Sequence, residues 1–364
     1  MLPAPTAPRF DPRVIVTCMK RRFTGVSGTV NALLPVLPGM VDVAYVGADL
    51  PGVALAKARH PHAFRRMGLW KAIRTSLRRR ADGARRTWHV RRNHELLLAI
   101  VLRDVVRLPI RVLFTSAAIR RHSLLPRLLI ARADAVIATT PAAAALVPHV
   151  VATVGHGVDT ARFRPAEDRA KAWRAAGLPG EHGILVAGRV RPEKGVHLFV
   201  EAMIRLLPRH PGWTAIIAGR VKPEDRAFAD ALRVRAAEAG LADRVRFEGE
   251  VDAADMPAWY ARCLITVACP LYEGFGLTVI EAMASGCAVV ASRAGAFESM
   301  VVPGETGTLV APGNVDELAA AIEPMLADPA GTAEVGTRGR ARACARFSIE
   351  SEARGIAAAI DRLR

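Results

Sequence analysis

The sequence predicts an α/β protein with two domains, each formed by a parallel sheet with helices on both faces. Three observations carry this prediction. The chain has 364 residues, which is more than a single hydrophobic core usually serves. Short apolar runs alternate with stretches of helical periodicity through both halves. Glycine-containing loops follow the first apolar run of each half, as they do at the ligand-binding edges of parallel sheets.

The first half contains six predicted strands, and most of them are separated by helices, which favours parallel pairing. The loop after the first strand spans residues 20–29. We expect a helix from about Val30 and another over Glu95–Leu108. The predicted strands are Arg13–Cys18, Val41–Val46, Thr87–Val90, Arg111–Thr115, Ala135–Thr139 and Val151–Val154.

The second half repeats this plan after a polar span, Pro165–His182, that we interpret as the crossing between domains. Its predicted helices are Val196–Leu207, Glu224–Ala239, Ala254–Arg262, Leu277–Ser285 and Val315–Leu326, and a last helix covers Ile349–Leu363. The predicted domains are therefore residues 1–165 and 166–346, followed by the helical segment 347–364. The predicted strands are Ile184–Ala187, Thr214–Ala218, Val245–Phe247, Leu264–Ala268, Ala288–Ala291 and Thr308–Val310.

Composition excludes several classes of protein. Apolar residues make up 51% of the chain and charged residues 23%, which suits ordinary hydrophobic cores. There is no uncharged apolar stretch of membrane-spanning length and no apolar core of signal-peptide type, so we expect a cytoplasmic protein. The five cysteines form no CxxC pair, and no metal-ligand cluster is evident, so we expect neither a disulfide framework nor a bound metal.

The net charge of +17 is concentrated in one segment. Between residues 56 and 134 there are twenty Lys or Arg but only four acidic residues. Such a field predicts an anionic partner: nucleic acid, an anionic membrane surface or an acidic substrate. Aromatic residues are scarce there and do not alternate with the arginines as a base-stacking surface requires, so nucleic acid is disfavoured.

The run from Glu273 to Gly286 is typical of a strand, a glycine-rich turn and a helix. Gly274 and Gly276 allow the main chain to approach a ligand, and a helix N-terminus suits a phosphate. Glu273 in the turn and Glu281 in the helix can accept hydrogen bonds from sugar hydroxyls. Glutamates near a helix start also occur merely because they complement the helix dipole.

A second loop, Gly188–Gly195, follows the first strand of the second half and brings Arg189 and Lys194 to the start of the next helix. Arg189 can donate to two phosphate oxygens at once, and Lys194 supplies a mobile positive charge. These cations and the helix N-terminus predict a diphosphate site that needs no metal. The alternative is a surface loop with ordinary cations.

Three motifs together resemble the signatures of retaining glycosyltransferases of family 4, which have the GT-B fold: Gly155–Pro165, Gly188–Gly195 and Glu273–Gly286. The match extends from about residue 150 to 315. The resemblance implies two Rossmann-like domains with a central cleft, a C-terminal helix that crosses back to the N-terminal domain, and no cofactor besides a sugar-nucleotide co-substrate.

The resemblance also implies roles for individual residues. The donor diphosphate would contact Arg189 and Lys194, the donor sugar Glu273 and the ribose Glu281. The reaction would retain configuration along a front-side path, in which the leaving diphosphate accepts the proton of the acceptor hydroxyl. The residues expected to bind the donor are Gly25, Gly28, Gly188, Gly274, Phe275, Gly276, Leu277, Thr278 and Glu281, with Gly249 and Glu250 at the base.

The first half of the chain resembles a narrower group within this family. Its segments Lys20–Val30, Trp88–Asn93 and Leu113–Ala117 resemble the lipopolysaccharide-core mannosyltransferases, which move mannose from GDP-mannose to the Kdo-containing inner core. This implies an anionic lipid-linked glycan acceptor and a peripheral position on the inner face of the bacterial inner membrane. The cations expected to bind the acceptor are Lys20, Arg21, Arg22, Arg91 and Arg92, and those expected to meet the bilayer are Arg65, Arg66, Arg78, Arg79, Arg80, Arg85 and Arg86.

One departure from the family pattern concerns a histidine near the reacting sugar. The segment around Thr115 lacks it, which leaves His89, His122 and His156 as substitutes. We favour His89 as the catalytic histidine, because it ends a predicted strand and precedes a basic pair.

Three alternatives stay open at this point. The enzyme could use a UDP-sugar donor and another acceptor, because the loops that would hold the base do not distinguish guanine from uracil. The chain could instead be a polyanion-binding or membrane-binding protein without catalysis. A nonhydrolysing sugar-nucleotide epimerase shares the fold but should lack the arginine-rich features.

Overall fold

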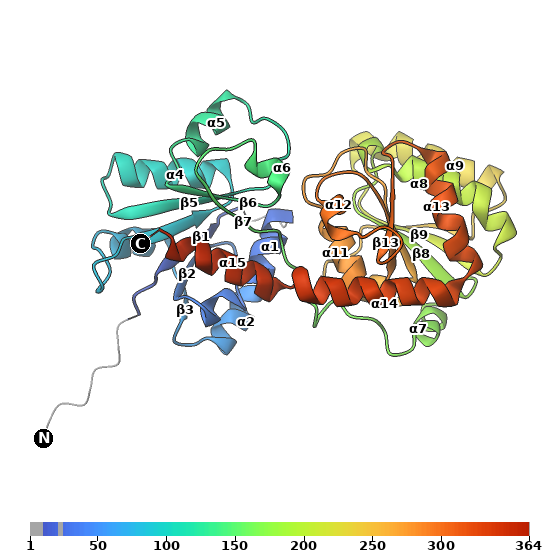
Figure 1. Ribbon diagram of the computed structural model, residues 1–364, viewed down its shortest axis with the longest axis horizontal. Coiled ribbons are helices and arrows are strands. Elements are labelled where there is room, and N and C mark those ends of the chain that lie inside the picture. The colour runs from blue at the N-terminus through green and yellow to red at the C-terminus, as the bar shows by residue number, and fades with distance from the viewer. Residues whose placement is uncertain (1–9, 21–24, 364) are drawn as a thin grey trace, which may run out of the picture. The chain divides into compact units, whose positions relative to one another are not determined.

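The computed structural model describes residues 10–20 and 25–363 and divides them into two compact units (Figure 1). Unit 1 comprises the chain up to Gly157 together with the segment from Ile349, and unit 2 is Val158–Ser348. Each unit is built on a sheet whose strands all pair in parallel, so the predicted α/β fold class is confirmed. The units divide after Gly157 rather than after residue 165, because Val158 and Phe163 are buried in the core of unit 2.

Unit 1 has a seven-stranded sheet in the order β3-β2-β1-β4-β5-β6-β7. The edge strand β3 was not predicted, since it has three residues and two of them are exposed arginines. The strands are β1 Val14–Cys18, β2 Val43–Gly47, β3 Phe64–Arg66, β4 Arg86–Val90, β5 Ile110–Ser116, β6 Ala135–Ala138 and β7 Val150–Thr153.

Helices cover this sheet, and the last of them comes from the far end of the chain. Helix α15 buries Ile349, Ile356 and Ile360 in the same core as β1 and β2, which confirms the predicted return of the C-terminal helix. Among the described residues helix α1 spans Gly25–Leu33, so it includes residues 25–29, which the sequence placed in a loop. The helices are α1 Gly25–Leu33, α2 Pro51–Arg59, α3 Leu69–Ser76, α4 Asn93–Asp104, α5 Leu124–Ile130, α6 Pro141–Ala144 and α15 Ile349–Asp361.

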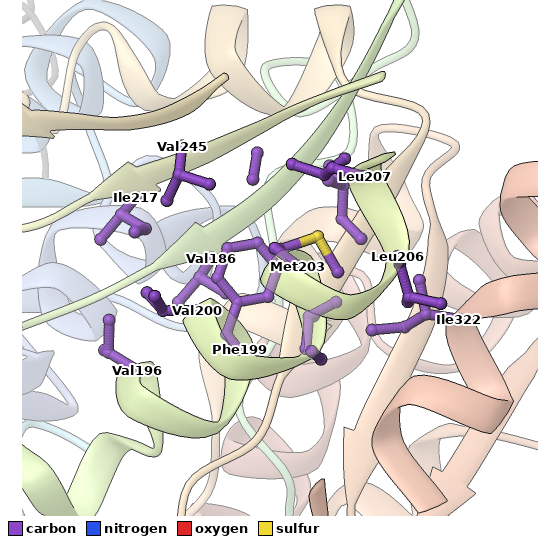
Figure 2. Close-up of a cluster of buried hydrophobic side chains, with 14 of the residues drawn as sticks. Val186, Val196, Phe199, Val200, Met203, Leu206, Leu207, Ile217, Val245 and Ile322 are labelled. Atoms are coloured by element: carbon purple, nitrogen blue, oxygen red, sulfur yellow. The ribbon is translucent and has the colours of Figure 1, made fainter. Parts of the chain in front are cut away.

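Unit 2 has a six-stranded sheet in the order β10-β9-β8-β11-β12-β13. Figure 2 shows one side of its core, where Phe199 and Met203 of α8 pack against Val186 and Ile217 of the sheet. The strands are β8 His182–Ala187, β9 Trp213–Ala218, β10 Val245–Gly249, β11 Ile265–Ala268, β12 Ala288–Ser292 and β13 Gly307–Val310. The helices are α7 Arg169–Ala175, α8 Val196–Leu206, α9 Arg226–Glu238, α10 Met256–Arg262, α11 Leu277–Ala284, α12 Phe297–Met300, α13 Val315–Ala327 and α14 Pro329–Arg346.

The span 165–182 is not the crossing between units that its polar sequence suggested. It carries α7, whose start is capped by the side chain of Asp168, and the fully buried Trp173 anchors it in the core of unit 2. Helix α14 was also missed, because its buried positions include glycines and its exposed face is rich in arginine. A methyl group at Gly336 would lie 2.2 Å from the Gly286 carbonyl oxygen, so α14 packs directly on that backbone.

Candidate active site

The two predicted ligand-binding loops of unit 2 meet at one point of its sheet. Strands β8 and β11 are neighbours, and the strand order reverses between them. Ligands of open parallel sheets bind outside the carboxyl ends of the strands at such a reversal. The Gly188–Gly195 loop follows β8 and the Glu273 turn follows β11, so both reach this edge.

Lys194 and Glu273, which are 79 positions apart, form a direct ion pair here. The Nζ of Lys194 lies 2.5 Å from Oε2 of Glu273, while Oε1 of the same carboxylate accepts the Gly274 N–H at 2.8 Å. Both side chains keep part of their surface exposed, 25% for Lys194 and 19% for Glu273. The pair therefore holds a cation and a hydrogen-bond acceptor side by side within reach of a ligand.

Two glycines fix the shape of these loops. Gly195 has φ +70°, and a methyl group there would lie 1.9 Å from the carbonyl oxygen of Cys269. Gly276 has φ +93°, and a methyl group there would lie 2.0 Å from the Phe297 ring. Any other residue would strain both turns. The positions of the Lys194 and Glu273 loops therefore depend on a backbone geometry that only glycine permits.

The N-terminus of α11 opens at the same edge. Gly276 caps this helix, and the first intrahelical bond runs from the Val279 N–H to the Gly276 carbonyl. The N–H groups of Leu277 and Thr278 therefore precede the hydrogen-bond ladder, at the positive end of the helix dipole. Both residues are half-buried, which agrees with a role in holding an anion through the main chain.

Arg189 is exposed on the same loop as Lys194, and the structure does not bring it into the Lys194–Glu273 pair. The main chain beside it is fixed, because the Gly188 N–H donates to the Ala218 carbonyl. A methyl group at Gly188 would meet no atom within 4 Å, whereas one at Gly219 would lie 1.6 Å from the Gly188 carbonyl oxygen. The side of Gly188 where a side chain would stand is therefore open, whereas its carbonyl packs closely against Gly219.

Glu281 lies half-buried on α11, where Oε2 accepts a hydrogen bond from the Tyr260 hydroxyl at 3.1 Å. Burial raises the pKa of the Glu281 carboxyl to about 7, although the Tyr260 hydroxyl and the Arg162 guanidinium act in the opposite direction. Tyr260 and Arg162 are partners that sequence reasoning missed, because they lie in other elements and belong to no motif. A carboxyl with this pKa changes its charge near neutral pH.

Other predicted donor residues take different positions. Phe275 is buried in the core of unit 2, so its side chain supports the turn, and a contact with the donor would have to come from its main chain. Gly249 has φ +73° and its carbonyl accepts the Gly219 N–H, while Glu250 is exposed 3.8 Å from Arg220. Gly25 and Gly28 lie in the first turns of α1 in unit 1.

Arg91 has a structural role that differs from the predicted acceptor contact. Its guanidinium is buried, donates to Oγ1 of Thr29 at 2.8 Å and pairs with Glu352 of α15 at 3.1 Å. The Glu352 carboxylate also contacts the His156 ring at 3.2 Å and accepts the Gly157 N–H at 2.8 Å. Burial alone would raise the pKa of Glu352, but His156, Arg91 and the Gly157 N–H lower it to about 2.

Of the other four predicted acceptor cations, the structure describes two, Lys20 and Arg92. Lys20 is exposed, and Arg92 is half-buried and donates to Oγ of Ser27 at 3.0 Å. Arg21 and Arg22 lie outside the described residues. Lys20 and Arg92 follow β1 and β4, the two strands between which the order of the unit 1 sheet reverses.

His89 lies in the middle of the unit 1 sheet with no exposed surface. Its Nε2 lies 2.7 Å from Oγ1 of Thr115, and burial, followed by the nearby Arg91, lowers its pKa to about 3. The ring is therefore neutral at physiological pH and has no surface with which to touch a substrate. His122, another of the sequence candidates, is half-buried 3.4 Å from Oγ of Ser116.

The arginines expected to meet a bilayer are not equivalent. Arg86 is buried, pairs with Asp11 and donates to the Arg78 carbonyl, so it is a structural residue and the prediction for it is corrected. Arg80 is half-buried beside Asp82 and Asp11. The remaining members are exposed, namely Arg65, Arg66, Arg78, Arg79 and Arg85.

Within residues 10–20 and 25–363, no group of three or more His, Cys, Asp or Glu is arranged to hold a metal ion. In the same residues, no helix combines the length and the apolar character needed to cross a bilayer.

The fold is that of GT-B glycosyltransferases: the Anabaena HepE protein in complex with UDP-glucose aligns with a TM-score of 0.78 at 20% identity, over 96% of this chain and 99% of that one. The model for glycosyl transferases group 1 matches residues 171–342, which include both loops described above.

Two full-length relatives are lipopolysaccharide core biosynthesis mannosyltransferases. That of Rhizobium leguminosarum bv. viciae is 44% identical over 97% of both chains, and that of Rhizobium meliloti is 41% identical over 97% of this chain and 98% of the relative. The chain therefore belongs to the group 1 glycosyl transferases. The predicted family and the predicted glycosyltransferase activity are confirmed.

Proposed function

We propose that the protein transfers mannose from GDP-mannose to the Kdo-containing inner core of lipopolysaccharide, with retention of configuration and without a metal ion. The observation that carries the proposal is the Lys194–Glu273 pair at the strand-order reversal of unit 2. The choice of mannose and of a lipopolysaccharide acceptor is supported by the names of the two full-length relatives. The proposed place of work is the inner face of the bacterial inner membrane.

The chain's own groups suit the departure of a nucleoside diphosphate. Lys194 and the exposed Arg189 would stabilise the negative charge that develops on the leaving diphosphate. The N–H groups of Leu277 and Thr278 would add main-chain donors at the helix N-terminus. Glu273 would accept a hydrogen bond from a sugar hydroxyl, and the diphosphate itself would take the proton of the acceptor hydroxyl. No side chain is required as a nucleophile.

A transfer assay tests this proposal. Purified protein is given GDP-mannose, UDP-glucose or UDP-galactose, with a detergent-dispersed Kdo-lipid acceptor and with EDTA. We expect hexose transfer from GDP-mannose alone, at a rate that EDTA does not change. Transfer from a UDP-sugar would instead support the alternative donor. A protein that binds the anionic lipid but neither hydrolyses nor transfers any sugar nucleotide would be a binding protein, and the proposal would be wrong.

The raised pKa of Glu281 predicts a pH dependence of donor binding. If the carboxylate accepts the ribose hydroxyls, binding needs the deprotonated form. With a pKa of about 7, its ionised fraction falls about tenfold between pH 8 and pH 6, so the Kd for GDP-mannose should rise by about that factor as the pH falls. Calorimetric titration measures this directly, because the diphosphate diester of GDP-mannose does not titrate in this range. Glu281→Gln should bind with a Kd that is nearly independent of pH, and an unchanged pH profile in this variant would exclude Glu281 as the cause.

A further inference from the structure

The outer surface of α4 and α5 in unit 1 exposes an unusual number of large aliphatic side chains. The two helices contact each other and follow neighbouring strands, β4 and β5 (Figure 1). Leu97 and Val101 of α4 and its C-cap residue Val105 are spaced four residues apart, which places them on one face. This group, called here the α4–α5 surface, has side chains that are 38–73% exposed: Leu97, Val101, Val105, Val106, Leu124, Leu125 and Leu128.

Exposed basic residues follow α4, precede α5 and lie within α5. Arg107, Arg120, Arg121 and Arg127 are all exposed, and among the described residues no acidic side chain forms an ion pair with any of them. The two acids nearby, Asp104 and Asp134, are already neutralised by Arg103, Arg111 and Arg132. The α4–α5 surface therefore combines exposed apolar side chains with arginines of the same segments that lack an acidic partner.

An open cavity adds to this surface. It has a volume of about 280 Å³ and is lined mainly by apolar side chains of α5 and of the segment 146–148, with Arg127 and His122 as its polar members. An apolar cavity beside a guanidinium suits a molecule that carries both an acyl chain and an anionic group.

We propose that the α4–α5 surface docks on an anionic lipid bilayer, with Leu124, Leu125 and Leu128 inserted at the boundary between headgroups and acyl chains. A second copy of the chain fits less well, because a two-fold contact would bring the same arginines against each other. Lipid headgroups supply the negative charge that these arginines lack within the protein. The proposal deepens the proposed function, since it names the surface that meets the acceptor's membrane. It differs from attachment through charge alone, because part of the binding energy is apolar.

Vesicle sedimentation tests the docking surface without donor or acceptor, so its result is independent of the transfer assay. The vesicles contain phosphatidylcholine with or without 30% phosphatidylglycerol. The test variant is Leu125→Ser/Leu128→Ser, whose sites are 65% and 57% exposed. The control is Leu55→Ser/Val234→Ser, which removes side chains of similar exposure, 50% and 55%, from α2 and α9.

We expect the test variant to lose about tenfold or more in affinity for the anionic vesicles, while the control stays within about twofold of the unmodified protein. The variant Arg120→Gln/Arg121→Gln/Arg127→Gln should lose the preference for anionic over neutral vesicles. Binding of the unmodified protein should weaken at 0.5 M NaCl without vanishing. Equal thermal midpoints would show that the variants are folded.

Three results would overturn the proposal: no binding to anionic vesicles, equal binding by the test variant, or binding that salt abolishes completely. A dimer in light scattering that the leucine substitutions dissociate would assign the surface to a second copy instead.

Discussion

Replacement of Lys194 by methionine is expected to lower kcat/KM for sugar transfer by a factor of about 10²–10³, because a preorganised charge at the leaving group typically contributes that much. The thioether keeps most of the apolar stem and removes the charge. It also leaves the Glu273 carboxylate, now 19% exposed, without its cation. Steady-state kinetics with GDP-mannose and calorimetric binding of GDP measure the two consequences separately. Both catalysis and GDP affinity should fall.

The matched control is Lys171→Met, which removes an exposed lysine from α7 in the same unit. It should leave kcat/KM for transfer and the affinity for GDP unchanged. Glu273→Gln separates the two members of the pair. It frees Lys194 from its partner, so GDP should bind as well as before or better, while transfer falls because a sugar-hydroxyl contact is weakened. Lys194→Met activity close to that of the unmodified enzyme would remove the ion pair from the mechanism.

Glu352→Gln is expected to destabilise unit 1 by about 3–5 kcal/mol, the usual cost of breaking a buried ion pair from one side. Arg91 and Glu352 have only 3% and 2% of their side-chain surface exposed, so bulk water has little access to the guanidinium that loses its carboxylate. His156 and the Gly157 N–H lose the same partner. Hydrogen exchange of α15 measures the effect locally, which avoids treating a protein of two units as a two-state system. Exchange of α15 should become much faster.

Glu350→Gln is the control, because it alters an exposed glutamate on the same helix and should leave the exchange of α15 unchanged. The pH dependence provides a second check. The pKa of Glu352 is about 2 in the folded protein and near 4.5 in an ordinary glutamate. Its contribution to stability is thus complete above pH 4.5 and is lost as the pH falls from 4.5 to 2. If Glu352→Gln left α15 as protected as Glu350→Gln does, the network would not hold the helix.

The loops of the candidate site could be predicted because their backbone conformation requires glycine at particular positions, and these glycines can be read from the sequence. Gly195 and Gly276 are needed at positive φ beside other backbone or ring atoms, and each lies next to a residue that the site uses. The alternation of strands and helices then placed the two loops at one sheet edge. These signals are local, so a single sequence shows them.

What the sequence did not reveal depends on contacts between distant segments. Arg91 resembled a free cation because its partner, Glu352, lies 261 positions away. Trp173 anchors a span that is polar around it, and the start of α1 lies among residues that favour loops. Burial decides each of these cases, and burial is a property of the folded chain.

We propose above that unit 2 holds the donor diphosphate at the Lys194–Glu273 edge of its sheet without a metal ion. A crystal structure with GDP-mannose, grown in the presence of EDTA, tests it most directly. We expect the diphosphate within hydrogen-bond distance of the Lys194 Nζ and of the main-chain N–H groups at Leu277 and Thr278. A donor bound at another edge, or one that is ordered only when a divalent cation is added, would contradict it.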